Sequence, residues 1–178
     1  MIAIIAEKPS VGMDIARVVG ADTRNDGYCS GNGYMVTWAL GHLVSLATPD
    51  TYGYTKTAAE DLPMLPDPFR LVSRQMRTDR GMVTDIAASK QLKVIESVFN
   101  RCDSIIVATD AGREGELIFR WIYDFLGCTK PFRRLWISSL TDEAIRKGLE
   151  ELKDGSEYDS LYAAADSRAK ADWLVGMN

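Results

Sequence analysis

The sequence predicts an α/β fold built on a mainly parallel sheet flanked by helices. Short, continuously apolar runs at residues 2–6 and 104–109 suit strands that are buried on both faces. Segments with helical spacing of apolar residues separate these runs, and a third strand is expected near residues 132–137. Alternation of strands with helices is typical of sheets whose strands run parallel.

The first half of the chain should contain one helix, one hairpin and a long loop. Pro9 opens a helical stretch that ends at Gly20. The glycine-rich residues 31–33 predict a turn that leads into a strand at residues 34–40. Residues 41–83 contain four prolines and are expected to be irregular. A loop of that length inside a compact domain is usually functional or ordered by a partner.

Three helices are expected between residues 86 and 152. One covers residues 86–99, a strongly amphipathic one covers residues 117–126, and one begins after Thr141, which is a good N-cap. The apolar positions that indicate them are Ile86, Leu92, Ile95, Phe99, Leu117, Ile118, Trp121, Ile122, Phe125, Leu126, Ile145, Leu149 and Leu152.

Residues 153–156 are the best candidate for a domain boundary. An alanine-rich helix is expected beyond them at residues 157–175, with no later element for it to pack against. We therefore expect a fragment, in which residues 1–155 form one domain and residues 156–178 begin a second, helical domain.

Composition excludes several classes of protein. With 178 residues, 46% of them hydrophobic and 26% charged, the chain can bury a core and is not disordered. A net charge of -4 excludes a generally basic coat protein but permits a local basic groove. One histidine and three scattered cysteines exclude a structural zinc site. No apolar run approaches the roughly 20 residues of a membrane span, and a cytoplasmic protein is expected.

Acidic residues follow two of the predicted strands. Glu7 follows the first, and Asp110 and Glu114 follow the run at residues 104–109. If the strands are neighbours, these carboxylates share one crevice, and carboxylate oxygens are the ligands that Mg²⁺ prefers. The alternative is that the acids only cap a helix or favour its dipole. The glycines at positions 112 and 115 and the preceding strand favour the functional interpretation.

The same residues carry a resemblance to a known family. The segments Glu7-Lys8-Pro9-Ser10 and Thr109-Asp110-Ala111-Gly112-Arg113-Glu114-Gly115-Glu116 resemble the Toprim domain of type IA DNA topoisomerases, and within them bacterial DNA topoisomerase III. The likeness continues in order through residues 41–43, 60–63, 134–141 and 167–176, so it covers essentially the whole chain.

The resemblance implies a magnesium-assisted isomerase that breaks one DNA strand by transesterification. Glu7 would act as general acid for the leaving 3′ oxygen and as base on religation, and burial or nearby acids would need to raise its pKa. Lys8 would bring positive charge to the scissile phosphate. Glu7, Asp110 and Glu114 would hold Mg²⁺. The nucleophilic tyrosine of the family belongs to a later domain, so this chain alone is expected to bind metal weakly and not to cleave DNA.

One position departs from the family pattern. The middle acid of the family's DxDxE motif is Gly112 here, so we expect weaker Mg²⁺ binding and no second tightly held metal. Glu116 is either a substitute metal ligand or a solvated acid in the first turn of a helix. These two interpretations stay open at the level of sequence.

DNA-binding residues are less firmly indicated. His42, Arg113 and Arg168 are expected to lie near a single-stranded segment of DNA, although His42 could be a core residue and Arg168 could pair with Asp172. Other interpretations concern larger sets. A basic run on the long loop either guides single-stranded DNA or is a solvated face; it consists of Arg70, Arg74, Arg77 and Arg80. Three tryptophans are expected in the core: Trp121, Trp136 and Trp173.

The full-length parent would relax negatively supercoiled DNA or unlink DNA molecules. A first alternative is another Toprim enzyme, a primase or a nuclease, that works without a tyrosine. A second is a non-catalytic nucleic-acid or protein-binding module whose acids are structural caps. A P-loop nucleotide hydrolase is excluded, because the sequence contains no GxxxxGK[ST].

Overall fold

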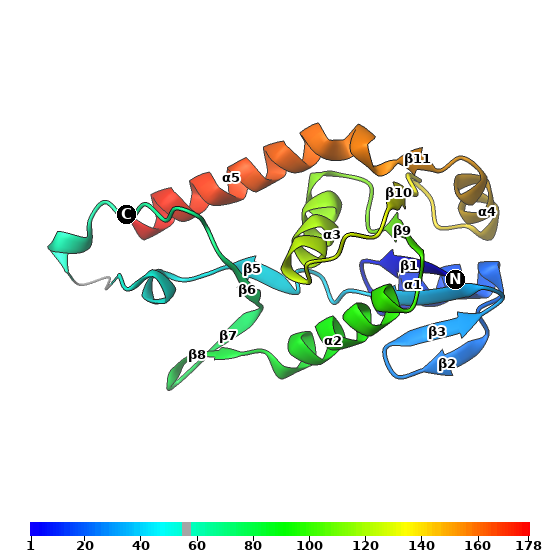
Figure 1. The fold of residues 1–178 in the computed structure, drawn as a ribbon, viewed down its shortest axis with the longest axis horizontal. Helices are drawn as coiled ribbons and strands as arrows, with labels where there is room; N and C mark the ends of the chain where they lie inside the picture. The colour runs from blue at the N-terminus through cyan, green and yellow to red at the C-terminus, as the bar shows by residue number, and fades with distance from the viewer. Residues whose placement is uncertain (55–57) are drawn as a thin grey trace.

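A seven-stranded sheet with helices on both faces organises the chain in the computed structural model, which describes residues 1–54 and 58–178 (Figure 1). The sheet order is β11-β10-β9-β1-β4-β3-β2. Its four central strands are mutually parallel: β10 (Phe132–Arg134), β9 (Ser104–Ala108), β1 (Ile2–Ala6) and β4 (Tyr34–Trp38). The predicted α/β class with a mainly parallel sheet is therefore confirmed.

Antiparallel strands close the sheet at both edges. On one side β4 continues into β3 (Tyr28–Gly31) and β2 (Thr23–Asn25), so the predicted hairpin is confirmed. On the other side β11 (Lys153–Asp154) runs antiparallel to β10. The centre of the sheet is thus buried on both faces, while its edges are short.

Two pairs of helices cover the two faces. Alternate side chains of a strand point to opposite faces, and within β1 Ala3 and Ile5 belong to one apolar cluster while Ile4 and Ala6 belong to the other. The first cluster packs on α2 (Ile86–Asn100) and α3 (Arg113–Phe125), and the second on α1 (Pro9–Val19) and α4 (Asp142–Glu150). The helices predicted at these places are confirmed, including the N-cap at Thr141, whose hydroxyl accepts from the Ala144 amide.

The segment at residues 41–83 is more regular than predicted. It contains a strand pair, β5 (Val44–Leu46) with β6 (Leu71–Ser73), and a hairpin of β7 (Gln75–Thr78) with β8 (Gly81–Thr84). Two short 3₁₀ turns, η1 (Pro49–Tyr52) and η2 (Ala59–Asp61), lie between β5 and β6. The expectation of a wholly irregular loop was wrong, although residues 55–57 lie outside the described residues.

The last helix also packs more fully than expected. After the 3₁₀ turn η3 (Gly155–Tyr158), α5 (Asp159–Met177) runs along α3, where the Trp121 indole donates to Asp166 over 2.9 Å (Figure 1). At its far end the Trp173 indole donates to the Ala47 carbonyl over 2.9 Å. The helix thus packs against elements that precede it in the chain. None of the helices within the described ranges is long and apolar enough to cross a membrane.

Candidate metal and nucleic-acid site

Glu7 and Asp110 meet where two neighbouring strands end. β1 and β9 pair in parallel with Ala6 opposite Ala108, so the residues that follow them leave the sheet at the same edge. The Asp110 amide donates a hydrogen bond to Glu7 Oε1 over 3.2 Å. The carboxyl ends of adjacent parallel strands are the usual place for a ligand in such a sheet. The neighbouring arrangement on which the sequence prediction depended is thus present.

The environment of Glu7 favours its protonated form. Burial raises the pKa of this carboxyl, and the nearby charge of Asp110 adds to the rise, while the Asp110 amide and His42 oppose it. A carboxylic acid with a raised pKa holds its proton nearer neutral pH and can donate it. Glu7 is therefore a carboxyl group with a raised pKa beside a second carboxylate.

A tight turn between β9 and α3 sets the position of Asp110. The buried Thr109 hydroxyl donates to the Gly115 carbonyl over 2.7 Å. A Cβ atom at position 115 would lie only 1.8 Å from the Asp110 carbonyl oxygen, so only glycine fits this close approach. The glycine in the motif is therefore explained by backbone contact.

His42 reaches the same place from the connection that follows β4, the strand next to β1. Gly41 has a φ of +67° and donates its amide to the Glu7 carbonyl over 3.2 Å, which brings the following residue to the site. His42 Nε2 lies 2.8 Å from Glu114 Oε2, in the first turn of α3. The His42 side chain is 39% exposed, so its alternative placement in the core is wrong.

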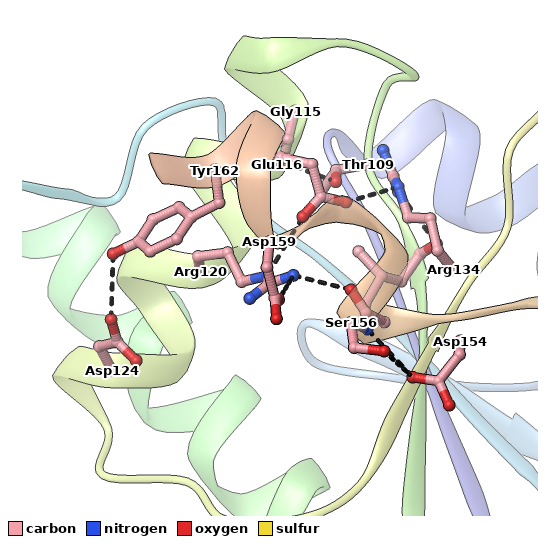
Figure 2. Close-up of polar contacts among 12 residues, drawn as sticks. Thr109, Gly115, Glu116, Arg120, Asp124, Arg134, Asp154, Ser156, Asp159 and Tyr162 are labelled. Atoms are coloured by element: carbon pink, nitrogen blue, oxygen red, sulfur yellow. Dashed lines mark hydrogen bonds and ion pairs between the residues drawn. The ribbon is translucent and has the colours of Figure 1, made fainter. Parts of the chain in front are cut away.

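Glu116 lies apart from these acids, in a buried ion-pair network (Figure 2). Its residue is 1% exposed, so the interpretation as a solvated first-turn acid was wrong. One carboxylate oxygen lies 2.8 Å from Arg134 Nε and the other 3.2 Å from Arg120 Nε. Burial raises the pKa of Glu116, and the two guanidinium groups oppose that rise. Both oxygens are thus engaged by arginines.

Arg134 is a structural residue that sequence reasoning missed. It is 1% exposed and donates to the Val107 carbonyl over 3.0 Å and to the Asp110 carbonyl over 2.7 Å. Its Nε is close to Glu116 but not aligned for a hydrogen bond, so this contact is an ion pair. Arg134 therefore holds the backbone of the turn that carries Asp110. β10 gave no local signal of this burial, because Phe132 is half-buried and Arg133 is exposed, so Arg134 is the only buried residue of the strand.

The remaining predicted cationic residues differ in exposure and in their ion-pair partners. Lys8, Arg113 and Arg168 are exposed, and Arg168 forms no ion pair with Asp172 in the described part of the chain. Arg74 does not belong to a free basic run, because its Nε pairs with Asp85 over 2.9 Å and it also donates to the carbonyls of Leu40 and His42. It joins the β6–β7 connection to the body of the protein.

The tryptophans divide in a similar way. Trp121 and Trp173 are 5% and 7% exposed, so their prediction as core residues is confirmed. Trp136 is 42% exposed and stacks on Tyr158, with ring centroids 4.8 Å apart and an interplanar angle of 17°. Its prediction as a core residue was wrong, because residue 136 lies beyond the end of β10.

The site offers oxygen ligands suited to a hard cation but not a closed metal cage. Within residues 1–54 and 58–178, no three His, Cys, Asp or Glu side chains are gathered tightly enough to hold a metal. Glu7 and Asp110 are nevertheless adjacent, and Glu114 belongs to the same turn region. One or two carboxylates with retained waters is the usual protein contribution to a magnesium site. The residues therefore fit Mg²⁺.

Comparison with known proteins places the chain in a family. The model of the Toprim domain matches residues 2–140. The chain belongs to the Toprim family. DNA topoisomerase 3 of Shouchella clausii is 50% identical to this Toprim chain over 180 residues, which cover 99% of the chain and 23% of the relative. DNA topoisomerase 3 of Bacillus subtilis is 47% identical over 179 residues, with coverage of 98% and 23%.

The structural comparison agrees on the fold. Full-length topoisomerase I from Thermotoga maritima superposes on this Toprim chain with a TM-score of 0.51 and 17% identity, and the match covers 85% of this chain and 21% of that one. The chain spans about a quarter of the length of the curated relatives it matches. The resemblance to bacterial type IA topoisomerases is thus confirmed for the family and the fold.

Proposed function

We propose that this chain is the Toprim part of a bacterial type IA DNA topoisomerase, which cleaves and rejoins a single DNA strand with the help of Mg²⁺. The observation that carries the proposal is the pair of carboxyls at the ends of β1 and β9, where burial and Asp110 raise the pKa of Glu7. Identity of about half to proteins called DNA topoisomerase 3 supports the reaction class.

The residues have distinct roles in this proposal. Glu7 gives its proton to the leaving 3′ oxygen and takes it back on religation, and Lys8 places an ammonium group near the scissile phosphate. Asp110 and Glu114, with Glu7 beside them, would hold Mg²⁺. The ion would neutralise backbone charge and favour rejoining. Glu116 is left out of this set, since both of its oxygens face arginines.

His42 and two arginines complete the proposed DNA contacts. His42 orients Glu114 through their 2.8 Å contact and remains partly exposed toward a strand at the site. Arg113 and Arg168 are exposed and suited to phosphate oxygens. We further propose that residues 1–155 form the Toprim domain and residues 156–178 begin the next one, and that the nucleophilic tyrosine lies in a later domain of the longer enzyme.

A chimera tests the catalytic role. This chain would replace the matching segment of the Bacillus subtilis relative, and formation of a covalent protein–DNA adduct would be measured. Loss of a general acid typically lowers a rate by about 10²–10⁴-fold, so Glu7→Gln should reduce adduct formation by that factor. Glu96→Gln changes an exposed acid on α2 and should leave it unchanged. Equal activity of the two variants would refute the assignment.

Calorimetric titration of Mg²⁺ into the chain tests the metal set. Binding should disappear in Asp110→Asn/Glu114→Gln and persist in Asp79→Asn/Glu96→Gln, which removes the same two charges at exposed positions. Binding that survives the first double substitution would exclude these ligands. Magnesium-dependent nicking of DNA by the chain alone would instead support the nuclease alternative.

A further inference from the structure

A cavity of about 820 Å³ opens beside Asp110 on the α1–α4 face of the sheet. Its apolar lining comes from α1, from the end of β9 and from Leu135 and Ile137 after β10, and residues of α4 also line it. Sites for small molecules commonly have volumes of roughly 300–1,000 Å³, so the cavity is large enough for a ligand. It extends from the proposed catalytic residues toward residues 136–140, which none of the roles assigned so far explains.

The charged groups of the cavity favour an anion. Lys8, Lys147 and Lys153 line it, against the two acids Asp110 and Glu151. None of the three lysines forms an ion pair with any residue that the structure describes. The lining thus carries an excess of positive charge on a chain whose net charge is -4. Unpaired ammonium groups around one hollow are suited to phosphate oxygens.

Two aromatic side chains also line the same cavity. Trp136 and Tyr158 form part of its lining and stack on each other at 4.8 Å. The Arg134 guanidinium lies 5.4 Å from the centre of the indole ring, which fixes Trp136 from the buried side of the structure. Trp136 remains 42% exposed, so part of this fixed aromatic pair faces the solvent, where another flat ring can contact it.

We propose that this cavity is a subsite for a nucleotide of single-stranded DNA, lying next to the phosphate at Glu7 and Lys8. Lys147 and Lys153 contact the phosphates of the strand, and a base lies against Trp136 and Tyr158. Base stacking on aromatic side chains tolerates any sequence, so the subsite positions the strand without reading it. This inference rests on the proposed function, because that function makes DNA the substrate.

Tryptophan fluorescence provides a direct test. The chain has four tryptophans, of which Trp38, Trp121 and Trp173 are at most 7% exposed. Addition of oligo(dT) octamer in EDTA at low salt should therefore quench emission mainly from Trp136. Trp136→Phe keeps an aromatic ring and should retain affinity, measured by anisotropy of a labelled octamer, while losing the quench. Absence of quenching at saturation, or quenching that persists in Trp136→Phe, would overturn the proposal.

A matched pair of double variants tests the phosphate contacts. Lys147→Gln/Lys153→Gln should weaken octamer binding and reduce the salt slope of log K by about 1.4, at about 0.7 for each lost contact to a single strand. Lys93→Gln/Lys130→Gln removes two charges elsewhere and should leave the slope unchanged. Equal slopes for the two would overturn the proposal. Equal affinity for thymidine monophosphate and the octamer would overturn the assignment to a strand.

The two proposals fail separately in these experiments. Glu7→Gln should reduce adduct formation in the chimera by about 10²–10⁴-fold yet keep the Trp136 quench, because octamer binding in EDTA needs neither proton transfer nor metal. Loss of the quench in Lys147→Gln/Lys153→Gln, with Glu7-dependent cleavage intact, identifies a strand subsite distinct from the chemical centre. Intact binding in that variant refutes the subsite and leaves the reaction class untouched.

Discussion

Neutralising Glu116 should destabilise the fold severely. Glu116→Gln keeps one side-chain oxygen, but the Arg134 guanidinium, in a residue 1% exposed, loses the negative charge that lies 2.8 Å from its Nε. Arg120 loses the same charge at 3.2 Å but keeps the carboxylate of Asp159 at 2.9 Å. Removing one partner of a buried ion pair costs about 3–5 kcal/mol, because the other charge stays buried without compensation. We expect a loss in the free energy of unfolding within that range.

Urea denaturation followed by far-UV circular dichroism measures this loss. Glu114→Gln is the matched control, since it makes the same change two residues away in the same helix at a side chain that is 76% exposed. Substitutions at exposed positions usually change stability by about 0.5 kcal/mol or less. A difference of less than about 1 kcal/mol between the two variants would refute the reasoning that the Glu116–Arg134 pair is an essential buried contact.

Two further predictions concern Glu7 and the turn that carries Asp110. The pKa of Glu7 is raised in the folded protein, so between the ordinary value of 4.5 and the folded pKa the native state binds more protons than the unfolded state. The free energy of unfolding that this group contributes should therefore fall as the pH rises through that interval. Urea denaturation across that interval should show a smaller fall for Glu7→Gln, and identical curves would contradict the shift. Gly115→Ala should displace the turn, because its Cβ would lie 1.8 Å from the Asp110 carbonyl oxygen; a thermal melt unchanged from wild type would contradict that geometry.

The elements that could be predicted are those with strong local signals. The runs at β1 and β9 are continuously apolar, and α3 has a clear apolar face that ends at Gly127. The adjacency of Glu7 and Asp110 also followed from sequence, since acids after two parallel strands meet if the strands are neighbours. These inferences needed only local pattern and the ordinary rules of parallel sheets.

The elements that were missed depend on contacts between distant residues. β5 and β6 have three residues each, and their pairing brings Val44 opposite Ser73, so no local periodicity reveals them. The burial of Glu116 is equally nonlocal, because its ion-pair partner Arg134 lies on β10. A first-turn acid looks the same in sequence whether it faces solvent or a buried arginine. Composition and spacing carry no information about that difference.

The far end of α5 supplies hydrogen-bond partners for Ala47 and Met64, which are synthesised long before it. The Asn178 side chain bonds both the amide and the carbonyl of Met64, 114 residues earlier, and Trp173 reaches Ala47 across 126 residues. A chain that emerges from the ribosome in order therefore holds Ala47 and Met64 without these partners until α5 has been made. Such distant contacts form late, since closing a long loop precedes the gain from the contact. Ala47 and Met64 thus stay accessible to chaperones and proteases on a nascent chain until α5 is complete.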